Sequence, residues 1–203
     1  MCPPTTCSSI AHGVSWRHVL PVLGLLVGAA SAAPVTYQID PTHTYPSFEA
    51  DHFGVSTWRG KFTKSAGSVT IDRAAGRGEI EVTIETASIE FGLPAMNAQA
   101  RSDQLLDVAR FPRATYKGTL VAFVNGAPTR ATGELTLHGV TKPLELSIQK
   151  FKCLPHPLNK REWCGADAVA TFDREAFGIG WGKQYGIDMA VTLQIQVEAF
   201  AAE

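Results

Sequence analysis

The sequence lacks the motifs that mark common classes of enzyme and nucleic-acid-binding protein. Its 203 residues contain no G-x-S-x-G elbow, no H-E-x-x-H pair and no Gly-rich phosphate loop. Lys and Arg number 18 against 19 Asp and Glu, without a basic run, so nothing attracts nucleic acid. We therefore expect no catalytic residues, no metal site, no cofactor and no nucleic-acid partner.

Charge is also scarce at the start of the chain. Residues 1–32 carry one charged side chain, Arg17, which is followed by an apolar run at residues 19–30 and by Ala30-Ser31-Ala32. A run this short, ending in small residues, is typical of a secretory signal peptide. We expect cleavage after Ala32, a periplasmic or secreted protein without stable membrane insertion, and one domain at residues 33–203. The alternative is a buried or membrane helix that stays attached.

Only two cysteines, Cys153 and Cys164, remain after residue 32. An exported protein meets an oxidising compartment, so we expect them to form a disulfide. A zinc site that also uses His156 is an alternative, but it needs a fourth ligand and a reducing environment. A redox-active pair is less favoured because the sequence has no C-x-x-C motif.

Alternation of apolar and polar residues dominates from residue 35 onward and predicts strands with one buried face. It is clearest at Asp188–Ala199 and Glu79–Glu85. Weaker strands are expected at residues 35–39, 44–50, 55–63, 67–71, 114–124, 130–138, 143–151 and 165–173. A short helical segment is expected near 95–108, where alternation stops after Pro94.

Eight or more short antiparallel strands must hide their edges, either in a barrel or in a sandwich. The alternation alone does not distinguish these two folds. A single helix among many strands favours a barrel with a lid or plug.

Three stretches carry a family resemblance: YQIDPTHTYPSFEADHFGVSTWRGKF, GELTLHGVTKPLEL and TFDREAFGIGWGKQYGIDMAVTLQIQVEA. In this order they resemble the YceI-like family of exported proteins. The resemblance implies an all-β fold, an extended antiparallel lipocalin-like β-barrel of about eight strands. It also implies binding of a polyisoprenoid or isoprenoid quinone in an apolar interior tunnel, for sequestration or transport. The CLPHPLNKREWC insert resembles one branch of this family. The chain departs from the family pattern at residues 103–112, so ligand contacts cannot be transferred there.

Strand parity places Pro46, Phe48, Ala50 and His52 on one inner face. His52 is either a core histidine with a satisfied hydrogen bond or a polar contact for a lipid head group. Inward aromatic side chains either fill the interior or line a cavity. With the resemblance, we expect the cavity lining to include Phe48, His52, Trp58, Phe62, Ile80, Val82, Ile84, Leu105, Tyr116, Phe177 and Trp181.

Three further side chains have structural interpretations. His43 is expected in a turn formed by Asp40 rather than in a metal site with His52. Arg174 is expected to tie a loop to the barrel rim rather than to bind an anion. His138 is expected on the wet face of a strand that is about to turn.

Two other functions stay open. A filled barrel could have a structural or stress-protective role through its outer surface. A lipid-modifying enzyme would need a clustered acid, base and nucleophile. A homodimer also stays open.

Overall fold

The computed structural model describes Met1 and residues 33–203. The predicted signal peptide and its cleavage site after Ala32 fall on residues 1–32, which lie outside the described residues apart from Met1, so both stay predictions. No helix in the described residues is long and apolar enough to cross a membrane.

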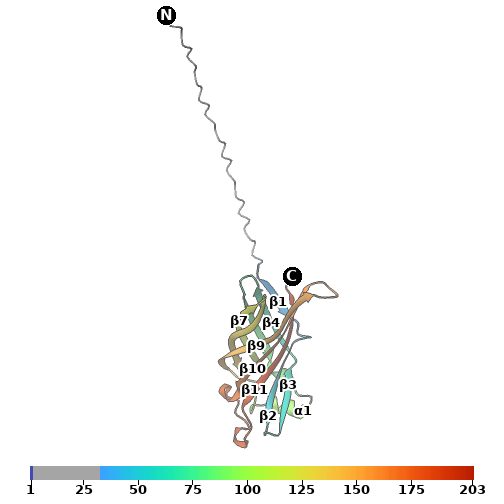
Figure 1. The fold of residues 1–203 in the computed structure, drawn as a ribbon. Coiled ribbons are helices and arrows are strands. Elements are labelled where there is room, and N and C mark those ends of the chain that lie inside the picture. Colours follow the sequence, from blue (N-terminus) through green and yellow to red (C-terminus); the bar gives the residue numbers. More distant parts are fainter. Residues whose placement is uncertain (2–32) are drawn as a thin grey trace. The chain divides into compact units, whose positions relative to one another are not determined.

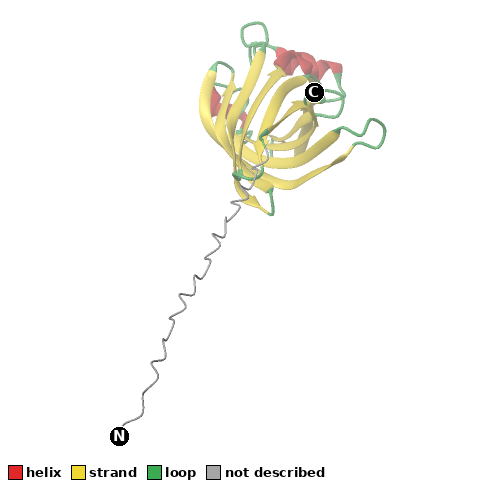
Figure 2. Ribbon diagram, turned by 90° about the horizontal axis from the view of Figure 1, so that it is seen from above, coloured by secondary structure: helices red, strands yellow, loops and turns green. Residues whose placement is uncertain are grey.

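Eight antiparallel strands close into a ring, as predicted (Figure 2). Their order is β1-β4-β5-β7-β8-β9-β10-β11, and β11 pairs with β1 to complete the barrel. Closure pairs strands that would otherwise present free edges. The strands are β1 (Val35–Ile39), β4 (Ser65–Asp72), β5 (Arg77–Glu85), β7 (Arg113–Val124), β8 (Ala127–Leu137), β9 (Val140–Pro155), β10 (Glu162–Asp173) and β11 (Ala190–Ala201).

Three more strands, β2 (Tyr45–His52), β3 (Ser56–Phe62) and β6 (Ile89–Glu90), extend the wall at one end. β1 pairs with the last residues of β11, and β2 pairs with its first half, at Val191–Gln196. β3 then pairs with β2, and β6 pairs with the end of β3. As a result, β2 and β3 lie at the opposite end of the barrel from β1 (Figure 1).

The helix is shorter than predicted. α1 spans Pro94–Arg101, and Pro94 occupies its first turn, where a missing N–H does least harm. Residues 102–110 form turns instead, in which the N–H of Leu106 donates to the carbonyl of Ala100 and Asp107 has a φ of 42°. Leu105 and Val108 still pack against the core, which explains why their spacing imitated a helical face.

Alternation sets the two faces of the strands. Val191, Leu193, Ile195 and Val197 of β11 face the interior, as the sequence predicts, while the intervening polar residues face outward. Three short 3₁₀ helices complete the fold: η1 (Thr86–Ser88), η2 (Arg174–Phe177) and η3 (Lys183–Tyr185). η2 and η3 lie in the connection between β10 and β11.

The hairpin between β8 and β9 corrects the prediction for His138. The strand ends at Leu137, and His138 and Gly139 form a two-residue turn with φ values of 50° and 74°. Two successive positive φ values define a type I′ turn, whose twist matches that of the strands. The His138 ring packs on Phe111 with centroids 4.3 Å apart, and its Nδ1 lies 3.1 Å from the carbonyl oxygen of Phe177. His138 therefore joins two loops and does not lie on the wet face of a strand.

Candidate functional site

The barrel encloses a cavity of about 260 Å³. Its walls are almost entirely apolar and come from strands on all sides, from α1 and from the connection between β10 and β11. At one end it is lined by Ile39 and Thr44, which are buried. At the other end it is lined by the partly exposed side chains of His52, Trp58 and Trp181. We call this second end the mouth.

Ten of the eleven side chains predicted from the sequence line this cavity. They are Phe48, His52, Trp58, Phe62, Ile80, Val82, Ile84, Leu105, Tyr116 and Trp181. The structure brings them together; that they contact a ligand stays a prediction.

Phe177 is the exception. It is only 2% exposed, and its ring packs edge-on against Phe172 with centroids 5.3 Å apart. Phe172 lines the cavity, whereas Phe177 does not. Phe177 lies in η2, where strand parity gives no guide to direction, so its inward assignment to the cavity was wrong.

The predicted lining omitted several residues that line the cavity. Strand parity places Pro46, Ala50, Val191, Leu193 and Ile195 on inner faces, but they were not among the residues expected to line it. Phe91, Met96, Arg174, Ile179 and Ile187 lie in the helix or in loops, and only the folded chain shows that they face the cavity.

An aromatic cluster forms the wall between the mouth and the middle of the cavity. The ring of Phe48 lies 5.8 Å from that of Phe62 and 5.5 Å from that of Phe91. Gly60 makes this possible, because a Cβ there would lie 2.6 Å from the Phe48 ring. The absence of a side chain at Gly60 therefore leaves room for the rings of Phe48 and Phe91.

His52 stacks on Trp58 at the mouth, with ring centroids 4.1 Å apart and an interplanar angle of 20°. Its backbone carbonyl accepts from the N–H of Val55 at 3.1 Å, but its ring has no hydrogen-bond partner among the described residues, so the structure does not support the interpretation of a core histidine with a satisfied hydrogen bond. Its ring nitrogens are therefore polar atoms at the mouth that are not hydrogen-bonded to any described residue.

Tyr116 and Arg174 also line the cavity, but their polar groups are already hydrogen-bonded. The Tyr116 hydroxyl donates to the carbonyls of Leu144 at 3.0 Å and Ala131 at 3.3 Å, and burial raises the pKa of Tyr116 to about 12. The Arg174 guanidinium donates to the carbonyls of Ile179 and Trp181, both at 2.9 Å, and burial lowers the pKa of Arg174. Arg174 thus holds the loop at the mouth, consistent with the structural role expected for it.

Beyond Ile39 the barrel interior is filled. Tyr37 is buried there, and its hydroxyl donates to Glu162 at 2.9 Å and accepts from Arg73 at 3.0 Å. Burial and the hydrogen bond to Glu162 raise the pKa of Tyr37. Cys153 and Cys164 are paired across β9 and β10 and form the predicted disulfide. Their sulfur atoms are joined to each other and are not zinc ligands.

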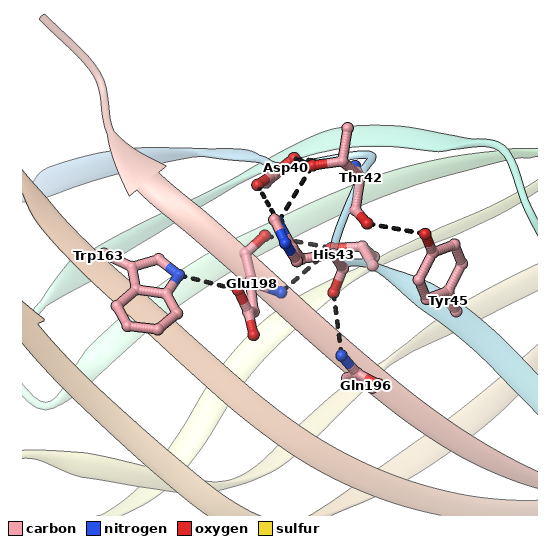
Figure 3. A network of polar contacts seen from close by, with 8 residues as sticks. Asp40, Thr42, His43, Tyr45, Trp163, Gln196 and Glu198 are labelled. Carbon is pink, nitrogen blue, oxygen red and sulfur yellow. Dashed lines mark hydrogen bonds and ion pairs between the residues drawn. The ribbon is translucent and has the colours of Figure 1, made fainter. Parts of the chain in front are cut away.

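His43 lies outside the cavity. Asp40 accepts from the backbone N–H of Thr42 at 2.8 Å, which is the expected Asx turn, and the Asp40 carboxylate also accepts from His43 Nδ1 at 2.7 Å (Figure 3). His52 faces the cavity, so the two histidines do not share a metal site.

Residues 37–199 match the YceI-like domain family. The chain belongs to this family. Protein YceI of Salmonella arizonae is 36% identical over 128 residues, which are 62% of this chain and 66% of that protein. The matched region therefore spans about two thirds of the length of this relative.

Solved YceI-like structures share the fold. The Campylobacter jejuni YceI protein has 21% identity and a TM-score of 0.65 over 75% of this chain and 90% of its own. A polyisoprenoid-binding domain from Saccharophagus degradans has 19% identity and a TM-score of 0.58 over 83% of this chain and 99% of its own. At such identities these likenesses support the barrel alone.

The segment that departs from the YceI-like pattern still contributes to the cavity. Leu105 and Leu106, in the turns after α1, both line it. This stretch therefore supplies part of the cavity wall from turns that follow α1.

Proposed function

We propose that the protein is an exported carrier that holds one isoprenoid lipid, with the tail in the cavity and the head group at the mouth. The cavity is the observation that carries this proposal. A filled barrel, the main alternative, leaves such a space unexplained. The Saccharophagus degradans neighbour, described as a polyisoprenoid-binding domain, adds support for this class of ligand.

The apolar walls suit a prenyl tail. Transfer of each CH₂ group from water is worth about 0.8 kcal/mol before ordering costs, so a long tail binds without polar contacts. The Tyr116 hydroxyl and the Arg174 guanidinium already donate to backbone carbonyls. They therefore contribute little to discrimination between one lipid tail and another. Selection among tails would then depend on length.

The mouth suits a flat head group. The stacked pair of His52 and Trp58 offers an aromatic face together with ring nitrogens that no described residue uses. An isoprenoid quinone could place its ring there and accept a hydrogen bond from His52. This arrangement supports binding rather than a lipid-modifying reaction, since the polar groups of Asp51, Tyr116 and Arg174 are all held by the backbone.

The compartment follows from the sequence and the disulfide. The signal peptide predicted at residues 1–32 and the disulfide between Cys153 and Cys164 both support an oxidising, extracytoplasmic location. We infer a periplasmic protein that sequesters or transports its lipid. A role in a stress response and a homodimer are further parts of the same proposal.

A cavity-filling substitution tests the proposal. Ala50 lines the cavity from β2, so A50F would place a ring in the space available to the tail. T132F places the same ring on the outer face of β8, where Thr132 is exposed, and is the matched control. We expect solvent extracts of the wild type and of T132F to contain an isoprenoid lipid by mass spectrometry, and A50F to contain at least about tenfold less.

A second variant tests the head-group contact. H52F keeps an aromatic ring against Trp58 but removes both nitrogens. The loss of one hydrogen bond is worth about 1 kcal/mol, so we expect quinone affinity to fall about fivefold and the affinity for a tail without a head group to stay unchanged. An extract without any lipid from native wild-type protein would count against the whole proposal, whereas an unchanged H52F would count only against the head-group contact.

A further inference from the structure

Four large apolar side chains are exposed around the mouth. Phe53 and Val55 lie in the turn between β2 and β3 and are 45% and 85% exposed. Trp181 and Tyr185 lie in the connection between β10 and β11 and are 36% and 62% exposed. We call these four side chains the mouth rim.

The two halves of the rim are held together by one carboxylate. Asp51 accepts from the N–H of Gly54, at the tip of the β2–β3 turn, at 2.9 and 3.0 Å. The same carboxylate accepts from the N–H of Asp188, at the end of the β10–β11 connection, at 3.1 Å. Segments far apart in the sequence therefore form a single rim.

The rim is continuous with the interior. Trp181 is both a lining residue of the cavity and partly exposed. The Phe53 ring lies edge-on to His52, 4.9 Å away, and His52 lines the cavity as well. An apolar surface thus runs without interruption from the outside of the molecule into the cavity.

The charges close to the rim do not favour an anionic surface. Lys183 is paired with Glu175, and Arg174 is held by backbone carbonyls. The charged groups of these segments comprise two cations and four carboxylates: Arg174, Lys183, Asp51, Asp173, Glu175 and Asp188. An apolar rim with a small excess of negative charge is complementary to a zwitterionic bilayer rather than to an acidic one.

We propose that the mouth rim docks on the surface of a zwitterionic phospholipid bilayer, so that lipid passes between the bilayer and the cavity without crossing water. This inference depends on the proposed function. Trp and Tyr prefer the boundary between lipid and water, where the ring is apolar and the polar atom stays hydrated. Docking removes the rim from water and aligns the mouth with the membrane. A prenyl tail then moves directly from one apolar environment to the other.

The exposed apolar residues at the other end of the barrel provide a control. Val124 lies beside the β7–β8 turn and Leu158 in the β9–β10 hairpin, and they are 59% and 87% exposed. The antiparallel order places both turns at the end opposite His52, away from the mouth. They match the rim in exposure but do not line the cavity.

The test uses lipid-loaded mature protein and vesicles of phosphatidylcholine and phosphatidylethanolamine. The rim variant V55S/Y185S leaves every cavity-lining residue in place, and V124S/L158S is its control. Flotation measures association, and the rate at which a quinone moves from donor to acceptor vesicles measures transfer. We expect both to fall about tenfold in the rim variant and to be unchanged in the control, with equal lipid content and little effect of 0.5 M salt.

Equal association and transfer by the rim variant and the wild type would overturn the inference. A requirement for anionic lipid, or loss of association in salt, would also overturn it. If light scattering instead showed that the rim variant converts a dimer to a monomer while vesicle association stays the same, the rim would be an interface between two copies of the chain. Lipid-loaded wild type that never associates with vesicles refutes docking alone, whereas wild type without lipid refutes the proposed function.

Discussion

At the scale of single residues, the pair of Asp40 and His43 makes a prediction about pH. The hydrogen bond from His43 Nδ1 to the Asp40 carboxylate raises the pKa of His43 above its usual value of about 6.5, and the negative charges of Asp40 and Glu198 act in the same direction. Because the folded state holds the proton more tightly, the pair stabilises the fold below the unfolded pKa. This contribution is lost as the pH rises through the raised pKa.

A titration of the histidine ring resonances by NMR measures this effect. We expect the pKa of His43 to lie above its usual value in the wild type and to fall toward that value in D40N, which removes the charge of Asp40 but keeps that of Glu198. The effect on unfolding should be small, since the His43 side chain is 63% exposed and solvent screens the pair. A value for His43 that does not change in D40N would contradict the role given to Asp40.

The direction of a side chain could be predicted from the sequence in strands but not in turns or 3₁₀ helices. Strand parity placed Phe48, His52 and Trp58 correctly because a strand alternates its faces whatever its neighbours are. Phe177 and His138 lie in a 3₁₀ helix and a turn, where direction depends on contacts with Phe172 and Phe111. The contact of His138 with Phe111 joins segments far apart in the chain, and Phe177 lies beyond the end of β10, so strand alternation determines the direction of neither side chain.

At the scale of elements, the hairpin of β9 and β10 carries the disulfide. Cys153 and Cys164 close a short loop at the filled end of the barrel, away from the mouth. In the chain-entropy model such a bond contributes on the order of 3 kcal/mol by restricting the unfolded chain. The strand pairing that continues on both sides, at Leu154 with Trp163 and at Lys152 with Gly165, should keep the hairpin formed without it.

We therefore expect C153A/C164A to lose about 2–3 kcal/mol in urea unfolding and to keep the lipid content of the wild type. Wild type with dithiothreitol is the control, because reduction removes the bond without changing the sequence. A variant that is as stable as the oxidised wild type would show that the bond does not stabilise the fold. One that folds but loses its lipid would show that this end of the barrel controls the cavity.

The presence of the strands and of the helix was predicted more accurately than the residues at which they end. The strands were recognised because a half-buried strand imposes a period of two on its own sequence. The helix was expected to continue to residue 108, but α1 ends at Arg101. Leu105 is partly buried in turns whose apolar spacing imitates that of a helix, and contact with the core alone does not distinguish the two conformations.

At the scale of the whole molecule, the sequence could not decide between a filled barrel and an open one. Inward side chains are the same in both cases, and the difference depends on the diameter of the ring and on where large and small residues meet. Gly60 illustrates this, because its missing side chain matters only once Phe48 and Phe91 lie against it. The resemblance to the YceI-like family favoured the open barrel, whereas the composition of the chain favoured neither form.

An open cavity has a consequence for the stability of the whole protein. A ligand that binds only the folded state stabilises it by RT ln(1 + [L]/Kd), or about 2.7 kcal/mol at a lipid concentration one hundred times Kd. Removing the lipid should therefore lower Tm, and adding it back should restore Tm. A50F should show little change on either step, because its added ring occupies the space of the tail. Calorimetry of wild type and A50F, each before and after delipidation, measures this; equal Tm values for loaded and delipidated wild type would mean that the cavity is not where the lipid binds.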